Sequence, residues 1–164
     1  MEMELAESQQ AIDESELNAD EGQQYLTFMM DGEEYGVDIL AVQEIRGWEP
    51  ATPIPNAPSH VKGVINLRGS IVPLFDLRQR FGLVEQEPDA LTVSIILKVE
   101  TEKSRREVGI LVDAVSDVYS ILDKHMKTNP DVGESHNADY ISNLATIDGV
   151  TVILLDLKTL LTFD

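Results

Sequence analysis

The sequence contains no cysteine, and this absence removes three kinds of chemistry at once. Without a thiol, the chain can form no disulfide, use no cysteine nucleophile and hold no cysteine-ligated metal. A chain of this kind fits a reducing compartment. Aromatic residues are also scarce, at 5% of 164 residues, whereas hydrophobic residues reach 43%. The chain therefore has enough apolar content for a core, built mainly from aliphatic side chains.

Long hydrophobic runs are missing as well. The longest apolar runs stop well short of the roughly 20 residues that cross a bilayer as a helix. The segment 1–22 has neither the basic region nor the apolar region of a secretory signal peptide. We therefore expect a soluble cytoplasmic protein.

Basic residues are few, because 12 Lys and Arg face 30 Asp and Glu, for a net charge of -18. Such a chain repels phosphate backbones and anionic membrane surfaces, which disfavours nucleic-acid and membrane partners. Its expected partners are proteins or cationic small molecules. Eight of the acids lie in residues 1–22, which have no Lys or Arg and little large apolar content. This composition predicts a disordered acidic tail that keeps the protein soluble.

From residue 23 onward the patterns are those of short strands and tight turns. Asp31-Gly32 lies between two strand-like segments, and this pair favours a two-residue hairpin. Apolar residues spaced by three in 39–45 suggest a short helical turn, and the proline-rich segment 51–60 predicts an extended loop. A second hairpin is expected around 63–77, with Arg68-Gly69-Ser70 at its tip. Asp76 is a good N-cap for a short helix that Gly82 ends.

The chain also contains an internal repeat. The segment "GVDILAVQEI" (36–45) matches "GILVDAVSDV" (109–118), with Gly, Ala and Val identical at the first, sixth and seventh places. The segment "GSIVPLFDLRQRF" (69–81) matches "GVTVILLDLKTLL" (149–161) in the same order. Two ordered matches indicate a tandem duplication.

The repeat predicts the fold class, which is all-β with short helices. A small sheet avoids open edges by closing into a barrel. We expect two five-stranded SH3-like barrels packed side by side, formed by repeats at roughly 24–83 and 91–163 within a domain 23–164. Each barrel is marginal in size, so a shared apolar seam is expected, with a groove where the barrels meet.

A search for catalytic or ligand motifs finds none that is specific. The sequence has no P-loop, dinucleotide fingerprint, HExxH or GxSxG motif. His60, His125 and His136 fall in loops without partner ligands, which favours solvated histidines over a metal site. The repeated carboxylates Asp76 and Asp156 occupy helix N-cap positions, so capping explains them better than acid–base catalysis. We expect no catalytic residue, no cofactor and no metal.

Arg68 has two interpretations. It is either a solvated turn residue that pairs with a nearby acid, a contact worth about 0–1 kcal/mol, or part of an interface. The repeat places Asp148 at the corresponding position, so the fold does not require an arginine there. Because arginine is enriched at interface hot spots, we favour the interface.

Three segments together carry a resemblance to a known family. "EEYGVDILAVQEIRG", "KGVINLRGSIVPLFDLR" and "VGILVDAVSDV" resemble the CheW family of bacterial chemotaxis adaptors, over residues 24 to about 161. The resemblance implies two SH3-like barrels and a non-enzymatic role. Members of this family bridge the cytoplasmic tips of methyl-accepting chemotaxis receptors to the histidine kinase CheA, whose regulatory domain is a paralogue of CheW.

The resemblance also implies which residues face the receptor. Carried over to this sequence, they are Val42, Glu44, Gly63, Arg68 and Val118. Apolar Val42 and Val118 would supply buried area, and Glu44 and Arg68 would fix the register. The kinase-binding residues are not assigned, and the acidic tail has no counterpart in the family motif.

Two other functions remain open at this point. The chain could be a CheW-like coupling protein of another chemosensory pathway, such as one for pilus motility. It could also be an enzyme of unknown type, which would require a groove with paired carboxylates of perturbed pKa.

Overall fold

A computed structural model describes residues 22–100, 105–127 and 138–161. The predicted acidic tail, apart from Gly22, and His136 lie outside this described part. The strands are β1 (Gln23–Met30), β2 (Glu33–Asp38), β3 (Val42–Gly47), β4 (Val61–Leu67), β5 (Ser70–Asp76), β6 (Val93–Glu100), β7 (Arg105–Val112), β8 (Ala114–Ile121), β9 (Met126–Lys127), β10 (Ile141–Ile147) and β11 (Val150–Leu155). The helices are η1 (Ile39–Ala41), α2 (Leu77–Arg80), η2 (Asp123–His125), η4 (Ala138–Tyr140) and α3 (Leu157–Leu160).

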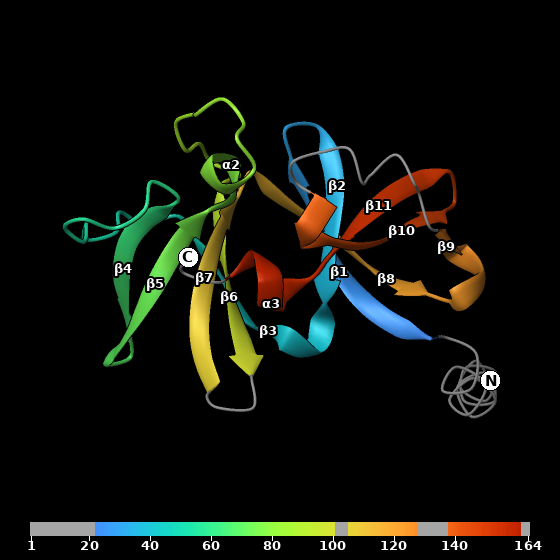
Figure 1. Cartoon of the computed structure of the whole chain (residues 1–164), viewed down its shortest axis with the longest axis horizontal. Coiled ribbons are helices and arrows are strands. Elements are labelled where there is room, and N and C mark those ends of the chain that lie inside the picture. Colours follow the sequence, from blue (N-terminus) through green and yellow to red (C-terminus); the bar gives the residue numbers. More distant parts are fainter. Residues whose placement is uncertain (1–21, 101–104, 128–137, 162–164) are drawn as a thin grey trace, which may run out of the picture.

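These strands form two sheets that lie side by side (Figure 1). Sheet A has the order β8-β1-β2-β11-β10-β9, and sheet B has the order β3-β6-β7-β5-β4. Apart from β9, which has two residues, each sheet has five strands. The prediction of an all-β fold with two five-stranded SH3-like subdomains is confirmed.

The two sheets do not follow the two halves of the sequence, so the assignment of one barrel to each repeat (24–83 and 91–163) is corrected. Hairpin β1–β2 from the first half lies in sheet A with strands of the second half. Hairpin β6–β7 from the second half lies in sheet B with strands of the first. The sequence pattern specifies a strand but not its partner, and equivalent strands of two copies offer equivalent edges.

The exchanged strands meet at two equivalent parallel joints. Strand β2 pairs with β11, and β7 pairs with β5. The first residue of the internal repeat, Gly36 or Gly109, lies at each joint, opposite Leu154 or Leu74. A Cβ on Gly36 would lie 3.0 Å from the Leu154 side chain, and one on Gly109 would lie 3.1 Å from that of Leu74. The repeated glycine therefore makes room for the neighbouring strand.

Each sheet closes through the chain that follows its edge strand. After β3, Thr52 pairs with Val64 of β4, the strand at the opposite edge of sheet B. After β8, the short strand β9 pairs with β10 in sheet A. The two closures occupy equivalent places, and both shorten the open edges as the barrel prediction requires.

Buried side chains from both sheets form one apolar cluster, which confirms the predicted seam. The cluster includes Phe28 and Val37 from sheet A and Phe75 and Ile110 from sheet B. Two smaller clusters each belong to one sheet. The first lies around Leu154 in sheet A, and the second lies around Ile96 in sheet B. Because most of the core is shared, each subdomain depends on the other for its apolar burial.

A buried ion pair also crosses between the sheets. The Arg78 side chain, which is 8% exposed, donates to both Asp113 carboxylate oxygens at 3.0 and 2.8 Å. Asp113 lies between β7 of sheet B and β8 of sheet A, and its carboxylate also accepts from the Asp31 amide in the β1–β2 turn. Arg78 also donates to the Val84 carbonyl at 2.7 Å, and its Nη2 lies 3.5 Å from the Asp31 carboxylate in a second ion pair.

Most local predictions hold. Asp31 and Gly32 both have positive φ and form the first hairpin turn. Asp76 accepts from the Arg78 amide and Asp156 from Thr159, so both carboxylates cap helices as predicted. The helical turn expected over 39–45 is correct only for η1, because β3 pairs with β6 from Val42 onward. No helix in the described ranges is long and apolar enough to span a membrane.

Candidate functional site

Arg68 lies at the tip of the β4–β5 hairpin. Arg68 and Gly69 have φ of 52° and 89°, the left-handed conformation of a two-residue hairpin turn. The Asn66 side chain accepts from the Gly69 amide and fixes the turn. Asp148 and Gly149 adopt the same conformation in the β10–β11 turn, with φ of 52° and 80°. The backbone is therefore alike in both repeats, and the arginine side chain is the difference.

The Arg68 side chain forms an ion pair with Glu44. Arg68 Nη2 lies 2.6 Å from Glu44 Oε1, although 66% of the arginine side chain remains exposed. Strands β3 and β4 are the two edges of sheet B, so this pair spans the closure of the barrel. The hydrogen bond from Arg68, followed by that from Arg46, holds the pKa of Glu44 below its usual value. Glu44 is thus a carboxylate at neutral pH.

Arg46 extends this cluster and was not among the predicted site residues. Arg46 Nη1 donates to Glu44 Oε2 at 3.1 Å, and its Nη2 lies 3.4 Å from Glu49. Residues two apart on a strand share a face, and this spacing between Glu44 and Arg46 is the signal that could have identified it. The result is one carboxylate held between two guanidinium groups.

The apolar residues of the site differ in exposure. Val42 is half-buried and packs against the shared core, so only part of it is available to a partner. Ile45 and Val118 are each 44% exposed. They occupy the same position of the internal repeat, one on β3 and one on β8, the edge strands of their sheets. Ile45 was missed from the sequence, and its alignment with Val118 was the available signal.

A bulge sets the direction of each edge strand. The β3–β6 register shifts between Val42 and Glu44, and the β1–β8 register shifts beside Val118. Thr27 stabilises the second bulge, since its hydroxyl accepts from the Asp117 amide and donates to the Asp117 carbonyl, both at 3.1 Å. Bulges redirect side chains at sheet edges, and here they precede Ile45 and Val118.

Gly63 contributes to the site through the backbone. It is buried, with φ of 147°, and a Cβ at this position would lie 2.2 Å from the Thr52 carbonyl oxygen. Thr52 and Val64 exchange backbone hydrogen bonds of 2.9 Å next to it. Gly63 therefore permits the barrel closure beneath the β4–β5 hairpin, and it offers no side chain to a partner.

The structure thus joins Glu44 directly to Arg68, with Val42 on the same strand as Glu44. Gly63 lies within β4, the strand that leads to Arg68. Val118 belongs to the other sheet, at its equivalent edge. The arrangement offers fixed charges and exposed apolar side chains, which suit a protein surface more than a small reacting molecule.

The histidines do not form a ligand cluster. His60 is buried rather than solvated as predicted, because its ring packs at 5.1 Å against Phe75 and contacts Arg80. Burial, with the nearby Arg80 charge, lowers the pKa of His60. His125 Nδ1 accepts from the Leu122 amide. In the described part of the chain, no three His, Asp or Glu residues are grouped to hold a metal ion.

Comparisons with known proteins place this geometry among chemotaxis proteins. The family model described as a CheW-like domain matches residues 24–164. The chemotaxis protein CheW of Klebsiella aerogenes is 42% identical over 140 residues, covering 85% of this chain and 82% of the relative. That of Rhizobium meliloti is 38% identical over 138 residues, covering 84% and 86%. The scaffolding protein TtCheW from Thermoanaerobacter tengcongensis has a similar structure, with a TM-score of 0.75, 29% identity and coverage of 86% and 88%.

Proposed function

This chain belongs to the CheW-like family, and from this premise we propose that it is a cytoplasmic chemotaxis adaptor that couples methyl-accepting receptors to the histidine kinase CheA. It does so without catalysis. Relatives named as chemotaxis proteins favour this role over the pilus-motility alternative.

The observation that carries the proposal is the Arg68–Glu44 pair, whose arginine side chain is 66% exposed. An exposed ion pair contributes little to the free energy of folding. We therefore assign this pair a role in binding a partner protein. Two charges in fixed positions select the orientation of a partner, and arginine is enriched at interface hot spots. Glu44, Arg68, Val42 and Val118 form the proposed receptor-binding surface, and Gly63 supports it by permitting the barrel closure.

The proposed mechanism is a change in how the bound proteins pack against one another. The helical hairpin tip of a receptor docks on this surface, with its polar groups facing Arg68 and Glu44. A change in the receptor then alters how adaptor and kinase pack, which shifts the kinase between states of different activity. The kinase regulatory domain binds other barrel surfaces of this chain.

The test is a pull-down of the full chain with purified CheA and a soluble receptor signalling fragment. We expect binding to both, and Arg68→Ala should lose receptor binding and receptor-coupled kinase activation. Arg105→Ala is the matched control, because Arg105 is also exposed and also pairs with a glutamate, Glu100, at 2.7 Å. Absence of association with either partner would defeat the adaptor proposal. Equal losses in both variants would defeat the site.

A further inference from the structure

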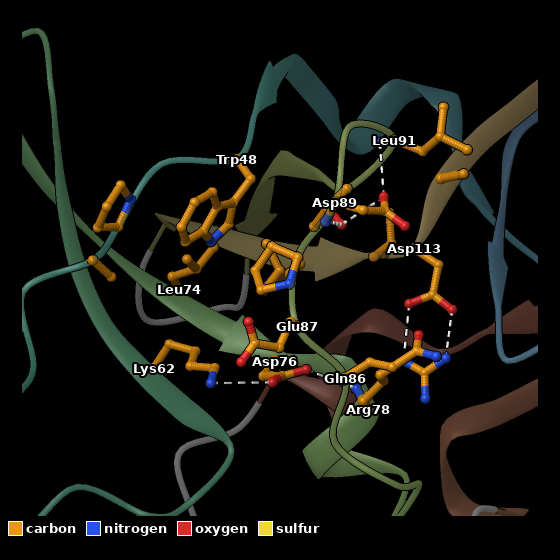
Figure 2. Close-up of a pocket in the computed structure, with 17 residues that line it drawn as sticks. Trp48, Lys62, Leu74, Asp76, Arg78, Gln86, Glu87, Asp89, Leu91 and Asp113 are labelled. Carbon is orange, nitrogen blue, oxygen red and sulfur yellow. Dashed lines mark hydrogen bonds and ion pairs between the residues drawn. The ribbon is translucent and has the colours of Figure 1, made fainter.

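A cavity of about 430 Å³ opens on sheet B. Lys62, Leu74 and Asp76 of the β4–β5 hairpin line it, whereas Arg68 at the hairpin tip does not. Its floor comes from strands β5 and β7, through Leu74 and Leu111. Its walls come from the segment after β3 and from the connector that leads from α2 to β6. Figure 2 shows Trp48 directly beside Leu74, with Glu87 between them and the Lys62–Asp76 pair. This volume lies in the range of small-molecule sites, about 300–1,000 Å³.

Two large apolar side chains at the cavity are accessible to a ligand. Trp48 is 42% exposed and Leu91 is 66% exposed, whereas Leu74 and Leu111 on the floor are buried. Both line the cavity, together with Pro50 and Pro88. A ligand with an apolar ring or chain would cover these surfaces, and an indole face also attracts a cation.

The charged part of the cavity is acidic. Its described lining holds four carboxylates and two basic side chains. Both bases are already engaged, since Arg78 is bonded to Asp113 and Lys62 lies between Asp76 and Glu85 at 3.6 and 3.7 Å.

Of the four carboxylates, only Glu87 makes no hydrogen bond or ion pair with another residue in the described ranges. Asp76 and Asp113 bind the two bases, and Asp89 accepts from the Leu91 amide at 2.8 Å. Glu87 is therefore available to a ligand cation.

We propose that this cavity is a binding site for an organic ammonium ion with an apolar body, such as an aromatic alkylamine. The apolar body lies against Trp48 and Leu91, and the ammonium group binds the Glu87 carboxylate. The net charge of -18 concentrates cations and repels anions around this opening. The inference is independent of the receptor-binding surface, because none of the proposed receptor-binding residues lines the cavity.

The chain supplies its own reporter for this site. Trp48 is the single tryptophan of the sequence, so intrinsic tryptophan fluorescence measures the cavity directly. The experiment titrates the full chain with phenethylammonium at neutral pH. Phenethyl alcohol is the neutral analogue of the same shape, and phenylacetate is the anionic one. We expect a saturable change in Trp48 emission with the ammonium, and much weaker responses to the other two.

Glu87→Gln tests the assigned carboxylate while keeping its size. We expect this variant to bind phenethylammonium about three- to tenfold more weakly, as loss of one charge contact implies. Glu33→Gln is the matched control, because it removes an equal charge from the exposed first residue of β2, outside the cavity lining. Lack of saturation would overturn the proposal. Equal binding of the three probes, or equal effects of the two variants, would do the same.

Discussion

Arg68 and Glu44 belong to opposite edges of sheet B, and their side chains meet at 2.6 Å. The pair forms only because the sheet curls into a barrel, yet it lies on the outside of the closure. Its exposure means that water screens the attraction. The pair therefore depends on the closed barrel but contributes little to the stability of the fold.

Removing either partner should leave the protein folded. We expect Arg68→Ala and Glu44→Ala each to lower the free energy of unfolding by about 1 kcal/mol or less. The double variant should show a coupling energy below about 1 kcal/mol. Urea denaturation measures these values. A large loss of stability in either single variant would show that the residue is structural and would remove it from the receptor-binding surface.

Gly63→Ala should act on the fold. The new Cβ would meet the Thr52 carbonyl oxygen, and the positive φ disfavours any side chain, so we expect a loss of about 1–3 kcal/mol or more. Gly47→Ala is the control, because a Cβ at Gly47 meets nothing within 4 Å and its φ is outside the left-handed region. Denaturation midpoints compare the two variants. Equal stability would contradict the role of Gly63 in barrel closure.

The Arg78–Asp113 pair should contribute far more than the surface pair. Asp113→Asn removes the principal charged partner of the buried Arg78 guanidinium and leaves only Asp31 at 3.5 Å, so we expect it to cost about 3 kcal/mol. Asp148→Asn removes a carboxylate from an exposed hairpin turn and should change stability by less than about 0.5 kcal/mol. Thermal and urea denaturation of the two variants distinguish a buried bridge from a surface charge.

The same pair predicts a dependence on pH. Burial alone would raise the pKa of Asp113, but hydrogen bonds from Arg78 and the Asp31 amide outweigh burial and hold that pKa below its usual value. A carboxyl group with a lowered folded pKa stabilises the protein above its unfolded pKa of about 3.9. This contribution is lost as the pH falls through the folded pKa. The stability difference between the wild type and Asp113→Asn should therefore be constant above about pH 5 and shrink below it. A difference that is unchanged in acid would contradict this account.

The acidic tail remains a prediction from composition. Deleting residues 2–22 should leave the affinity for CheA unchanged and lower the solubility of the protein. Titration of kinase binding before and after deletion measures the first effect. A large loss of affinity would assign the tail to the kinase interface.

Local features were predictable because a few neighbouring residues determine them. The Asp31-Gly32 turn and the Asp76 cap both depend on contacts within the same short segment. Three features of the site and core were not predictable, because they depend on tertiary packing. These are the burial of His60, the partner of Arg78 and the greater exposure of Ile45 than of Val42.

The exchange of hairpins was beyond prediction for a related reason. The internal repeat correctly indicated two similar units, and the recurring glycine at 36 and 109 was read as part of the match. Its physical role appears only at the parallel joints, where each glycine faces a strand from the other half of the chain. A sequence repeat identifies the strands that were duplicated. Which strands pair depends on which strand edges are free in the folded protein.

The crossed hairpins have a consequence for how the protein unfolds. Neither half of the chain contains a complete barrel. Cleavage in the connector between α2 and β6 would leave the first fragment without β6 and β7 of sheet B, and the second without β1 and β2 of sheet A. Folding must therefore be a single cooperative event, even though the molecule has two lobes. Each half of the chain contributes strands to both lobes. A force that a bound partner exerts on one lobe is therefore transmitted along the backbone to the other lobe.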